Sequence, residues 1–406
     1  MINLCVVGLG YVGLPLAVHA AKAGFNVIGF DIDEIKVSQL KLGQSNLLDI
    51  SPKEIIDLQE RGSLSFSRKI SRASEISIFV IAVPTPLDIN RRPDVSMLET
   101  ACDNIANSVI ENSLIINEST SYIGTLRNLI KPRIDSRSGL KNLKYAVAPE
   151  RIDPGNKSWN IKNTPRIIAG INSESQSRAV QFYSTFCGEI VQVSSPEVAE
   201  AAKLFENTFR QVNIALVNEL SKIADALSFS ANETISAAST KPFGFMPFFP
   251  SIGVGGHCIP IDPSYLAFSA EQVGKDSEFI KLANKTNSLM PRIVTERIKS
   301  YLGGNLNNKR IQLAGISYKC NTSDLRESPA LNLITELKSL GAIVSWHDPL
   351  VLTHNGEKSS NLDGDIDLGL IITPHAQIDF SIWKELQTKV IDLSSNSINY
   401  GWPKFF

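Results

Sequence analysis

The segment Gly255–Pro263 places one thiol, Cys258, between paired glycines and paired prolines. The glycines allow a ligand to approach the backbone, and the prolines restrict the chain around the thiol. A thiol titrates near about pH 8.5, so it needs a cation or a helix dipole to act as a nucleophile at neutral pH. Asp262 and Pro263 match a helix cap and a first helical residue, which puts Cys258 near the positive end of that helix. The pattern indicates a catalytic thiol, whereas a lone cysteine without such neighbours is typical of a buried structural residue.

Two side chains near the thiol are candidates for acid–base work. His257 is adjacent to Cys258, but adjacent side chains in an extended loop point apart, so His257 is the weaker candidate for a base. Asp262 can serve as a helix cap, as a reacting carboxylate, or as both.

Lys203 and Asn207 are four residues apart on a predicted helix and therefore share a face. Their apolar neighbours in the sequence are Leu204, Phe205, Phe209, Val212, Leu216 and Val217. In a site without water, such a pair can donate hydrogen bonds to a developing oxyanion. The alternative is a lysine at a solvated edge, with the asparagine satisfied by backbone groups, and the sequence does not decide between the two.

Gly8, Gly10 and Gly13 form a GxGxxG pattern between the first predicted strand and the first predicted helix. The glycines permit a tight turn, and the helix N-terminus offers N–H groups and a positive dipole end to a pyrophosphate. Asp31 ends the second predicted strand about 18 residues after Gly13, where a carboxylate holds the ribose hydroxyls of NAD and repels the 2′-phosphate of NADP. Together these features favour NAD binding over a glycine-rich turn that binds nothing.

Two further segments, Val83–Pro86 and Glu118–Thr120, follow predicted strands. Ligands of doubly wound sheets bind beyond the carboxyl ends of the strands, so both segments can face the cofactor. The alternative for the two prolines is a rigid turn.

The elements that must position these groups alternate along the first two hundred residues. The predicted strands are Ile2–Gly8, Phe25–Asp31, Ile76–Val83, Leu114–Glu118 and Tyr145–Pro149. Helical patterns lie between most of them, including Val95–Ile110 and Ile123–Arg133. Buried strands separated by helices imply a parallel, doubly wound sheet.

A long helix is predicted to begin at Ser194–Glu197, where serines precede a proline and an acid, and to continue to about Leu227. About 30 residues at about 1.5 Å each make roughly 45 Å, a length typical of a helix that joins domains or supports a subunit interface. Residues 240–263 then form a loop rich in Gly, Pro and Phe, and helical texture returns over 264–301.

A second, smaller α/β domain is predicted after the turn-forming segment Gly303–Asn308. Its predicted strands are Ile311–Ile316, Ile343–His347, Ile366–Ile372 and Val390–Leu393. Its predicted helices lie around Pro329–Leu340 and Ile382–Leu386. Asn355–Asp363 is predicted to be a polar surface loop.

The composition describes a globular chain of 406 residues with 43% hydrophobic and 20% charged content, long enough for two or three domains. Forty basic and 41 acidic residues give a net charge of -1, which argues against a general nucleic-acid or membrane-surface binder. The five cysteines form no CxxC pair, and no apolar run approaches the length of a membrane span. We therefore expect a cytoplasmic enzyme with reduced thiols.

Taken together, these segments resemble the UDP-glucose/GDP-mannose dehydrogenase family over nearly the whole chain. The first motifs that carry the resemblance are GLGYVGLPLA at the start, VPTP at 83–86, EST at 118–120 and APER at 148–151. The later ones are the helix EVAEAAKLFENTFRQVNIALVNEL, GVGGHCIPIDP at 253–263 and YKCNTSDLRESPAL at 318–331.

The resemblance implies an oxidation of a sugar C6 alcohol to a carboxylate, with two NAD reduced per sugar. Cys258 would hold the aldehyde as a thiohemiacetal and then as a thioester, which water releases as the uronic acid. Lys203 and Asn207 would stabilise the oxyanion, and Asp262 would orient or activate the water.

The resemblance also implies a set of binding residues and no metal. Thr120 and Glu150 match positions that serve water handling and general acid–base work. The expected cofactor contacts are Gly8, Gly10, Tyr11, Val12, Gly13, Asp31, Lys36, Thr85, Thr120 and Arg326. The expected substrate contacts are Glu150, Arg151, Lys203, Asn207, Gly255 and Lys319.

The implied architecture is α/β, with two Rossmann-like parallel-sheet domains joined by the long central helix. The expected divisions are an NAD-binding domain at 1–195, a central helical domain with the dimer contact and the catalytic loop at 196–300, and a UDP-sugar-binding domain at 301–406. The expected partners are a UDP-sugar substrate and a second copy of the chain through the central helix, with neither nucleic acid nor membrane.

Within the family, HCIP around the thiol and PFGFMPF at 242–248 resemble the branch that oxidises UDP-N-acetylhexosamines, with UDP-N-acetylglucosamine as the first candidate. UDP-glucose, UDP-N-acetylmannosamine and UDP-N-acetylgalactosamine are alternative substrates. A two-electron hydroxyacid-type dehydrogenase and a non-catalytic NAD-binding scaffold are alternative functions. The chain departs from the usual pattern at Pro250–Gly253, Cys320 and Ser323, and these departures remove no proposed reacting group.

Overall fold

The computed structural model describes residues 2–45, 47, 50–71, 75–152, 158–394, 400–402 and 404–406. The chain packs as two compact units. The first unit contains Met1–Glu206 and Ser264–Gly274, and the second contains Asn207–Pro263 and Lys275–Phe406. The domain limits expected at 195 and 300 stay predictions.

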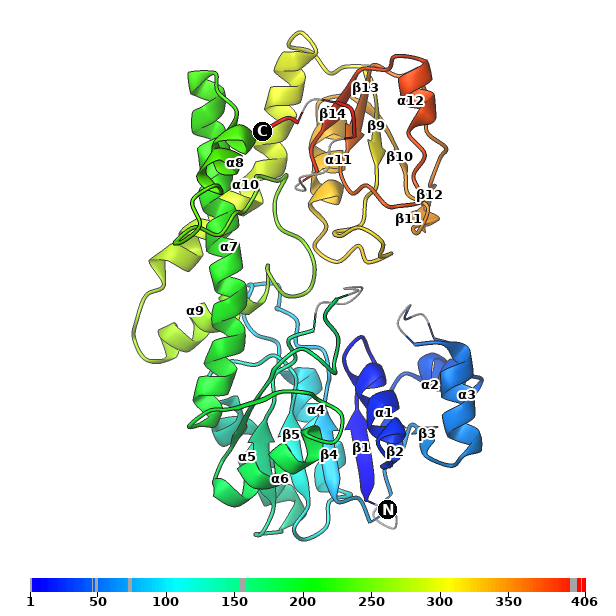
Figure 1. The fold of residues 1–406 in the computed structure, drawn as a ribbon, viewed down its shortest axis with the longest axis vertical. Helices are drawn as coiled ribbons and strands as arrows, with labels where there is room; N and C mark the ends of the chain where they lie inside the picture. The colour runs from blue at the N-terminus through cyan, green and yellow to red at the C-terminus, as the bar shows by residue number, and fades with distance from the viewer. Residues whose placement is uncertain are drawn as a thin grey trace. The chain divides into compact units, whose positions relative to one another are not determined.

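Among the described residues, the first unit contains an eight-stranded sheet in the order β3-β2-β1-β4-β5-β6-β7-β8 (Figure 1). The strands are β1 (Asn3–Val7), β2 (Asn26–Phe30), β3 (Leu64–Ser67), β4 (Ile78–Ile81), β5 (Leu114–Asn117), β6 (Lys144–Val147), β7 (Arg166–Gly170) and β8 (Ile190–Gln192). All neighbouring strands are parallel except β6 and β7. The five predicted strands are present, whereas β3, β7 and β8 were not predicted.

Helices cover both faces of this sheet, as the continuous apolar character of its strands requires. The helices of the first unit are α1 (Gly13–Lys22), α2 (Glu34–Lys41), α3 (Pro52–Glu60), α4 (Ser96–Ala106), η2 (Leu126–Ile130), α5 (Lys131–Ser138) and α6 (Ser173–Tyr183). Leu4 and Val6 of β1 belong to one core cluster with residues of α1, α3 and α6. Their neighbours Cys5 and Val7 belong to a second cluster with residues of α4 and α5. Successive side chains of one strand therefore enter two separate cores.

The long helix α7 (Pro196–Leu227) has 32 residues and begins and ends where the sequence predicts. Its residues up to Glu206 belong to the first unit, and those from Asn207 belong to the second. The buried polar residues in its central part include Lys203, Asn207, Gln211 and Asn218. The exposed apolar residues on the same helix include Phe205, Phe209, Leu216, Ile223 and Leu227.

The second unit contains a parallel four-stranded sheet in the order β10-β9-β13-β14 among the residues described. Its strands are β9 (Arg310–Ala314), β10 (Ile343–His347), β13 (Leu368–Ile371) and β14 (Val390–Asp392). Its helices are α8 (Ala231–Ala238), α10 (Glu278–Tyr301), α11 (Pro329–Ser339) and α12 (Ser381–Glu385), and α9 (Asp262–Gln272) begins in it. A short antiparallel pair joins β11 (Thr353–His354) to β12 (Glu357–Lys358), and β12 lies within the predicted polar loop Asn355–Asp363.

Candidate active site

Two of the three glycines after β1 are required by the packing of the chain itself. A Cβ on Gly13 would lie 1.8 Å from the Gly8 carbonyl oxygen, and one on Gly8 would lie 2.5 Å from the Ala82 carbonyl oxygen. Gly8 also has a φ of +96°, which side chains disfavour. By contrast, no described atom lies within 4 Å of a Cβ built on Gly10. The backbone at Gly10 is therefore open to a ligand at the N-terminus of α1, as a pyrophosphate needs.

Asp31 lies just beyond β2 and is buried, and its carboxylate is held by three donors. Oδ2 accepts from the Leu9 backbone N–H at 2.9 Å and from Lys36 Nζ at 2.8 Å. Oδ1 accepts from the Asp33 backbone N–H at 3.0 Å. Burial opposes ionisation, but these hydrogen bonds lower the pKa of Asp31 below its usual value. The carboxylate stays ionised and keeps acceptor capacity for ribose hydroxyls, so this edge fits NAD.

The turns after β4 and β5 are fastened to each other by Ser119. Its hydroxyl accepts from the Val83 N–H and donates to the Val83 carbonyl, each at 2.9 Å. The Thr85 carbonyl accepts from the buried Tyr265 hydroxyl at 3.1 Å, and Thr120 is half-buried beside Ser119. Sequence reasoning singled out Glu118–Thr120 but missed the contacts of Ser119, and it missed Tyr265, because neither contact follows from local spacing.

Glu150 and Arg151 follow β6 and are both tied down. Glu150 Oε1 accepts from the backbone N–H groups of Arg151 at 2.6 Å and Ile152 at 2.5 Å. Arg151 pairs with Glu206 at 2.7 Å and donates to the Pro165 carbonyl at 2.8 Å. Both side chains, which are expected to contact the sugar, are therefore oriented by groups of the chain itself.

In the second unit, Cys258 lies one turn before α9. Its carbonyl accepts from the N–H groups of Ile261 at 3.1 Å and Asp262 at 2.9 Å. The Cys258 side chain is exposed, whereas Asp262 is buried. Helix α9 begins at Asp262, one residue earlier than the predicted cap position implies.

Asn207 connects α7 to the first residue of α9. Its amide Nδ2 donates to Asp262 Oδ2 at 2.6 Å, and both side chains are buried. An amide nitrogen carries two hydrogens, so Asn207 can hold Asp262 with one and donate the other to a substrate oxygen. Lys203 lies one turn earlier on the same helix and is also buried.

The glycines before the thiol allow the loop to pack against residues 318–329. A Cβ on Gly255 would lie 2.9 Å from the Glu327 carbonyl oxygen, and one on Gly256 would lie 2.6 Å from the Tyr318 ring. The Gly256 N–H also donates to the Arg326 carbonyl at 2.9 Å. Other parts of the chain thus fill the space where a side chain at either glycine would lie. The predicted substrate contact of Gly255 stays a prediction, and it would be made by the backbone.

A stripe of amides on α7 fixes the start of the same loop. Asn218 Oδ1 accepts from the Ser251 N–H at 2.8 Å, and Asn218 Nδ2 donates to Asn287 Oδ1 at 3.0 Å. Asn287 Nδ2 in turn donates to the Gln211 carbonyl at 3.2 Å. Sequence reasoning missed this stripe, although Gln211 and Asn218 continue the buried face of Asn207 at helical spacing.

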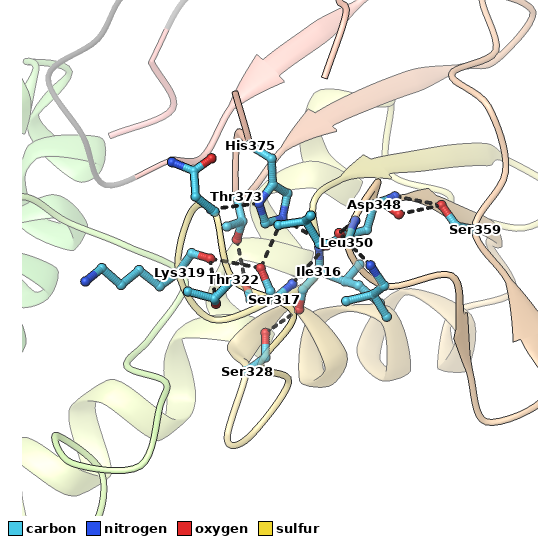
Figure 2. A network of polar contacts seen from close by, with 12 residues as sticks. Ile316, Ser317, Lys319, Thr322, Ser328, Asp348, Leu350, Ser359, Thr373 and His375 are labelled. Atoms are coloured by element: carbon cyan, nitrogen blue, oxygen red, sulfur yellow. Dashed lines mark hydrogen bonds and ion pairs between the residues drawn. The ribbon is translucent and has the colours of Figure 1, made fainter. Parts of the chain in front are cut away.

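Figure 2 shows a buried polar network at the carboxyl ends of β9, β10 and β13. His375 Nδ1 accepts from the Asn321 N–H at 2.9 Å, so the neutral ring carries its hydrogen on Nε2. Nε2 lies 3.1 Å from Asp348 Oδ2 and 3.1 Å from Ser317 Oγ. Burial opposes ionisation of Asp348, but hydrogen bonds from His375 and the Ile316 N–H lower its pKa. Because Nε2 carries the hydrogen, it donates towards Asp348 and Ser317 and cannot accept the proton of the serine hydroxyl. This is therefore a structural network and not a nucleophile–base pair.

The network holds the loop that carries Lys319. The Lys319 carbonyl accepts from Ser317 Oγ at 3.0 Å and from Thr322 Oγ1 at 3.2 Å, and the Lys319 side chain extends away from the network (Figure 2). Arg326 on the same segment pairs with Asp324 at 2.5 Å. In α/β sheets this edge is where ligands bind.

Three models of the UDP-glucose/GDP-mannose dehydrogenase family match the chain in order. The NAD binding domain covers residues 2–187, the central domain covers 197–289 and the UDP binding domain covers 312–397. The chain belongs to this family. The glycine turn lies in the first match, the thiol loop in the second and the Lys319 loop in the third, which confirms the predicted family.

Curated relatives and solved structures agree with this assignment. The UDP-N-acetyl-D-glucosamine 6-dehydrogenase of Pseudomonas aeruginosa is 34% identical over 361 residues, covering 86% of this chain and 83% of that protein. The UDP-N-acetyl-D-mannosamine dehydrogenase of Methanocaldococcus jannaschii is 34% identical over 350 residues, covering 85% and 79%. The structure of the UDP-D-ManNAc dehydrogenase from Pyrococcus horikoshii superposes with a TM-score of 0.88 at 29% identity, covering 100% of this chain and 97% of that one.

This enzyme is therefore an NAD-dependent nucleotide-sugar 6-dehydrogenase with a UDP-sugar as its substrate. Its predicted fold class of two Rossmann-like sheets and a long central helix is confirmed. In the parts of the chain that the structure describes, no group of three or more His, Cys, Asp or Glu side chains could hold a metal ion. Of the helices described, none has the length and apolar character needed to cross a membrane.

Gly10 and Gly13 provide a matched pair of variants that separates ligand binding from folding. We expect Gly10→Ala to unfold at the wild-type temperature but to bind NAD about tenfold more weakly, a loss of about 1.4 kcal/mol, because a methyl group enters the open side of the turn. Gly13→Ala should lose roughly 1–3 kcal/mol of stability, because its methyl group meets the Gly8 carbonyl. Thermal unfolding and NAD titration measure the two effects, and unchanged NAD affinity in Gly10→Ala would contradict this assignment.

His375 should affect the UDP-sugar and not NAD. His375→Leu removes one hydrogen-bond donor to Asp348 and leaves the Asn321 N–H without its acceptor, a cost of about 1–3 kcal/mol, so the Lys319 loop is expected to lose its fixed position. We expect KM for the UDP-sugar to rise roughly tenfold while KM for NAD stays unchanged. His354→Leu, on β11 of the same unit, is the control and should change neither constant. Equal increases in both constants would show a general loss of structure instead.

Proposed function

We propose that the enzyme oxidises the C6 hydroxyl of a UDP-N-acetylhexosamine, with UDP-N-acetylglucosamine as the first candidate, to the uronic acid through a covalent intermediate on Cys258. The observation that carries this proposal is the exposed Cys258 thiol one turn before a helix whose first residue, Asp262, is buried against Asn207. A helix N-terminus favours the thiolate, and a buried amide beside it favours an oxyanion.

When bound, each of two NAD molecules accepts one hydride from C6 of the sugar. Between the two oxidations, the Cys258 thiolate adds to the aldehyde carbon, and the carbonyl oxygen takes up a proton to give the thiohemiacetal. Loss of the second hydride and of that proton leaves a thioester. Water then adds to the thioester carbon, the C–S bond breaks, and the thiolate returns with a carboxylate product.

The other residues expected to take part in catalysis suit these steps by their chemistry. Asn207 and Lys203 donate hydrogen bonds to the oxyanion that forms when sulfur or water adds to the carbonyl carbon. Asp262, held by Asn207, orients the attacking water, and Thr120 assists it. Glu150 accepts or returns the proton of the sugar hydroxyl.

We propose a homodimer in which α7 packs against α7 of a second copy. The exposed apolar residues on α7 support this proposal, since Phe205 is 65% exposed, Leu216 64% and Leu227 68%. A stripe of this kind along a helix of 32 residues is unusual on a monomer surface. Light scattering in solution measures the mass that decides it.

The first test counts products. We expect two NADH and one uronate per UDP-sugar consumed, and we expect Cys258→Ala to lose turnover by at least on the order of 1000-fold with unchanged NAD affinity. Cys320→Ala is the matched control, since Cys320 is a half-buried thiol of the same unit, and it should keep near-normal turnover. One NADH per sugar with free aldehyde, or near-normal activity of Cys258→Ala, would contradict the thioester route.

The second test concerns the sugar, because relatives of equal identity carry the N-acetylglucosamine and N-acetylmannosamine names. Discrimination at C2 and C4 depends on pocket shape and amounts to about 1–3 kcal/mol for small differences. We expect kcat/KM for UDP-N-acetylglucosamine to exceed that for UDP-N-acetylmannosamine, UDP-N-acetylgalactosamine and UDP-glucose, measured as initial NADH release. A higher value for UDP-N-acetylmannosamine would favour the second candidate.

A further inference from the structure

Arg166 is a buried cation at the edge of the first sheet where the parallel strands end. It is the first residue of β7, and β7 runs antiparallel to β6. The beginning of β7 therefore lies beside the carboxyl end of β6, close to Ala148 and Glu150. The Arg166 side chain is 4% exposed, and its Nη1 donates to the Ala148 carbonyl at 3.3 Å.

The guanidinium of Arg166 bridges two carboxylates. Nη1 lies 3.2 Å from Glu118 Oε1, and Nη2 donates to Glu150 Oε2 at 3.2 Å. Glu118 directly follows β5 and Glu150 follows β6, so the arginine joins the segments just beyond the ends of two neighbouring strands. Planar guanidinium groups hold carboxylates in a fixed orientation, which lysine cannot do.

The Glu118 side of this bridge is buried inside the first unit. Glu118 and Tyr183 are buried, the Tyr183 hydroxyl donates to Glu118, and the Arg166 guanidinium lies 5.0 Å from the centre of the Tyr183 ring. Burial raises the pKa of Glu118 to about 7; Arg166 opposes that shift and Glu150 adds to it. A buried cation that is paired and stacked in this way has little freedom to move.

The Glu150 side of the bridge ends at a carboxylate that is itself an expected sugar contact. Glu150 Oε1 is fixed by two backbone N–H groups, and Oε2 is fixed by Arg166. Three donors set the plane of the carboxylate, while Oε2, which accepts from one of them, keeps acceptor capacity for a sugar hydroxyl. Among the described residues, Arg166 is the one side chain that holds the Glu150 carboxylate, and its other partners are the backbone N–H groups of Arg151 and Ile152.

We propose that Arg166 is a positioning residue for Glu150 during oxidation of the sugar hydroxyl, and that the buried Glu118–Tyr183 pair fixes Arg166 in place. This inference rests on the proposed function, which gives Glu150 the proton of the hydroxyl. Arg166 itself contacts neither substrate nor cofactor in this scheme. Its effect reaches the reaction through the orientation of one carboxylate.

If Arg166 only stabilised the fold, its variants would lose stability and turnover together. Removing the guanidinium leaves Glu118 and Glu150 without their shared cation, which destabilises the fold whatever the role of Arg166. Arg166→Met combined with Glu118→Gln removes one cation and one buried carboxylate together, so it restores charge balance without restoring the hold on Glu150. Stability and turnover should therefore separate in this double variant.

The experiment measures unfolding temperature, NAD affinity and kcat of the full chain for Arg166→Met, Glu150→Gln, Arg166→Met with Glu118→Gln, and Arg166→Met with Glu150→Gln. We expect Arg166→Met to lower kcat by on the order of 10-fold to 100-fold, the effect of a misplaced reacting group. Adding Glu118→Gln should recover most of the lost unfolding temperature and none of the lost kcat. In the Glu150→Gln background, Arg166→Met should change kcat by less than about twofold.

Arg133→Met is the matched control for losing an ion-paired arginine, because Arg133 pairs with Asp103 at 2.6 Å between α4 and α5 of the same unit. It should lower stability without lowering kcat. The proposal would be overturned if Arg166→Met lowered kcat equally in the wild-type and Glu150→Gln backgrounds. It would also be overturned if adding Glu118→Gln to Arg166→Met restored kcat. Full kcat in Glu150→Gln would also overturn the proposal for Arg166. If that variant still released two NADH per sugar in the same assay, the thioester route through Cys258 would be unaffected.

Discussion

The hydrogen bond from the Asn207 amide to the Asp262 carboxylate, 2.6 Å long and buried, joins the long helix to the turn that carries the thiol. The residues between Pro250 and Ile261 form neither helix nor strand, so their position depends on what fastens the two ends. At one end Asn218 holds the Ser251 N–H, and at the other Asn207 holds Asp262. Because both amides lie on α7, one rigid helix sets where Cys258 can be.

The other functional segments follow the same physical rule. Each is a turn just beyond the carboxyl end of a parallel strand, where backbone groups lose their sheet partners and need others. Ser119 supplies them after β4 and β5, Asp31 after β1 and β2, and the Asp348–His375 pair after β9, β10 and β13. Satisfying these backbone groups fixes the turns, and fixed turns place the side chains that meet a ligand.

The parts of the fold that could be predicted are those with a local signal. Strand runs, the serine–proline start of α7 and the GxGxxG turn each depend on neighbouring residues, and the structure contains all three. Strand β7 has five residues, as β1 and β2 do, but it was missed because no helix is described between it and β6, and Arg166 was missed with it. The His375 network was missed because its members are 27 to 58 residues apart, and only the folded sheet brings them together.

The near-neutral net charge of the chain does not reveal that two of its arginines are paired with carboxylates near the expected site residues. Arg151 and Arg166 are each held against carboxylates, Glu206 for one and Glu118 with Glu150 for the other. An arginine already paired in this way orients acids and is poorly placed to neutralise a diphosphate as well. We therefore expect binding of NAD and of the UDP-sugar to depend on directed groups, such as the N-terminus of α1 beside Gly10 and the side chain of Lys319. A chain with a formal charge of -1 can bind polyanionic ligands in this way because a few oriented donors act at short range, where net charge has little influence.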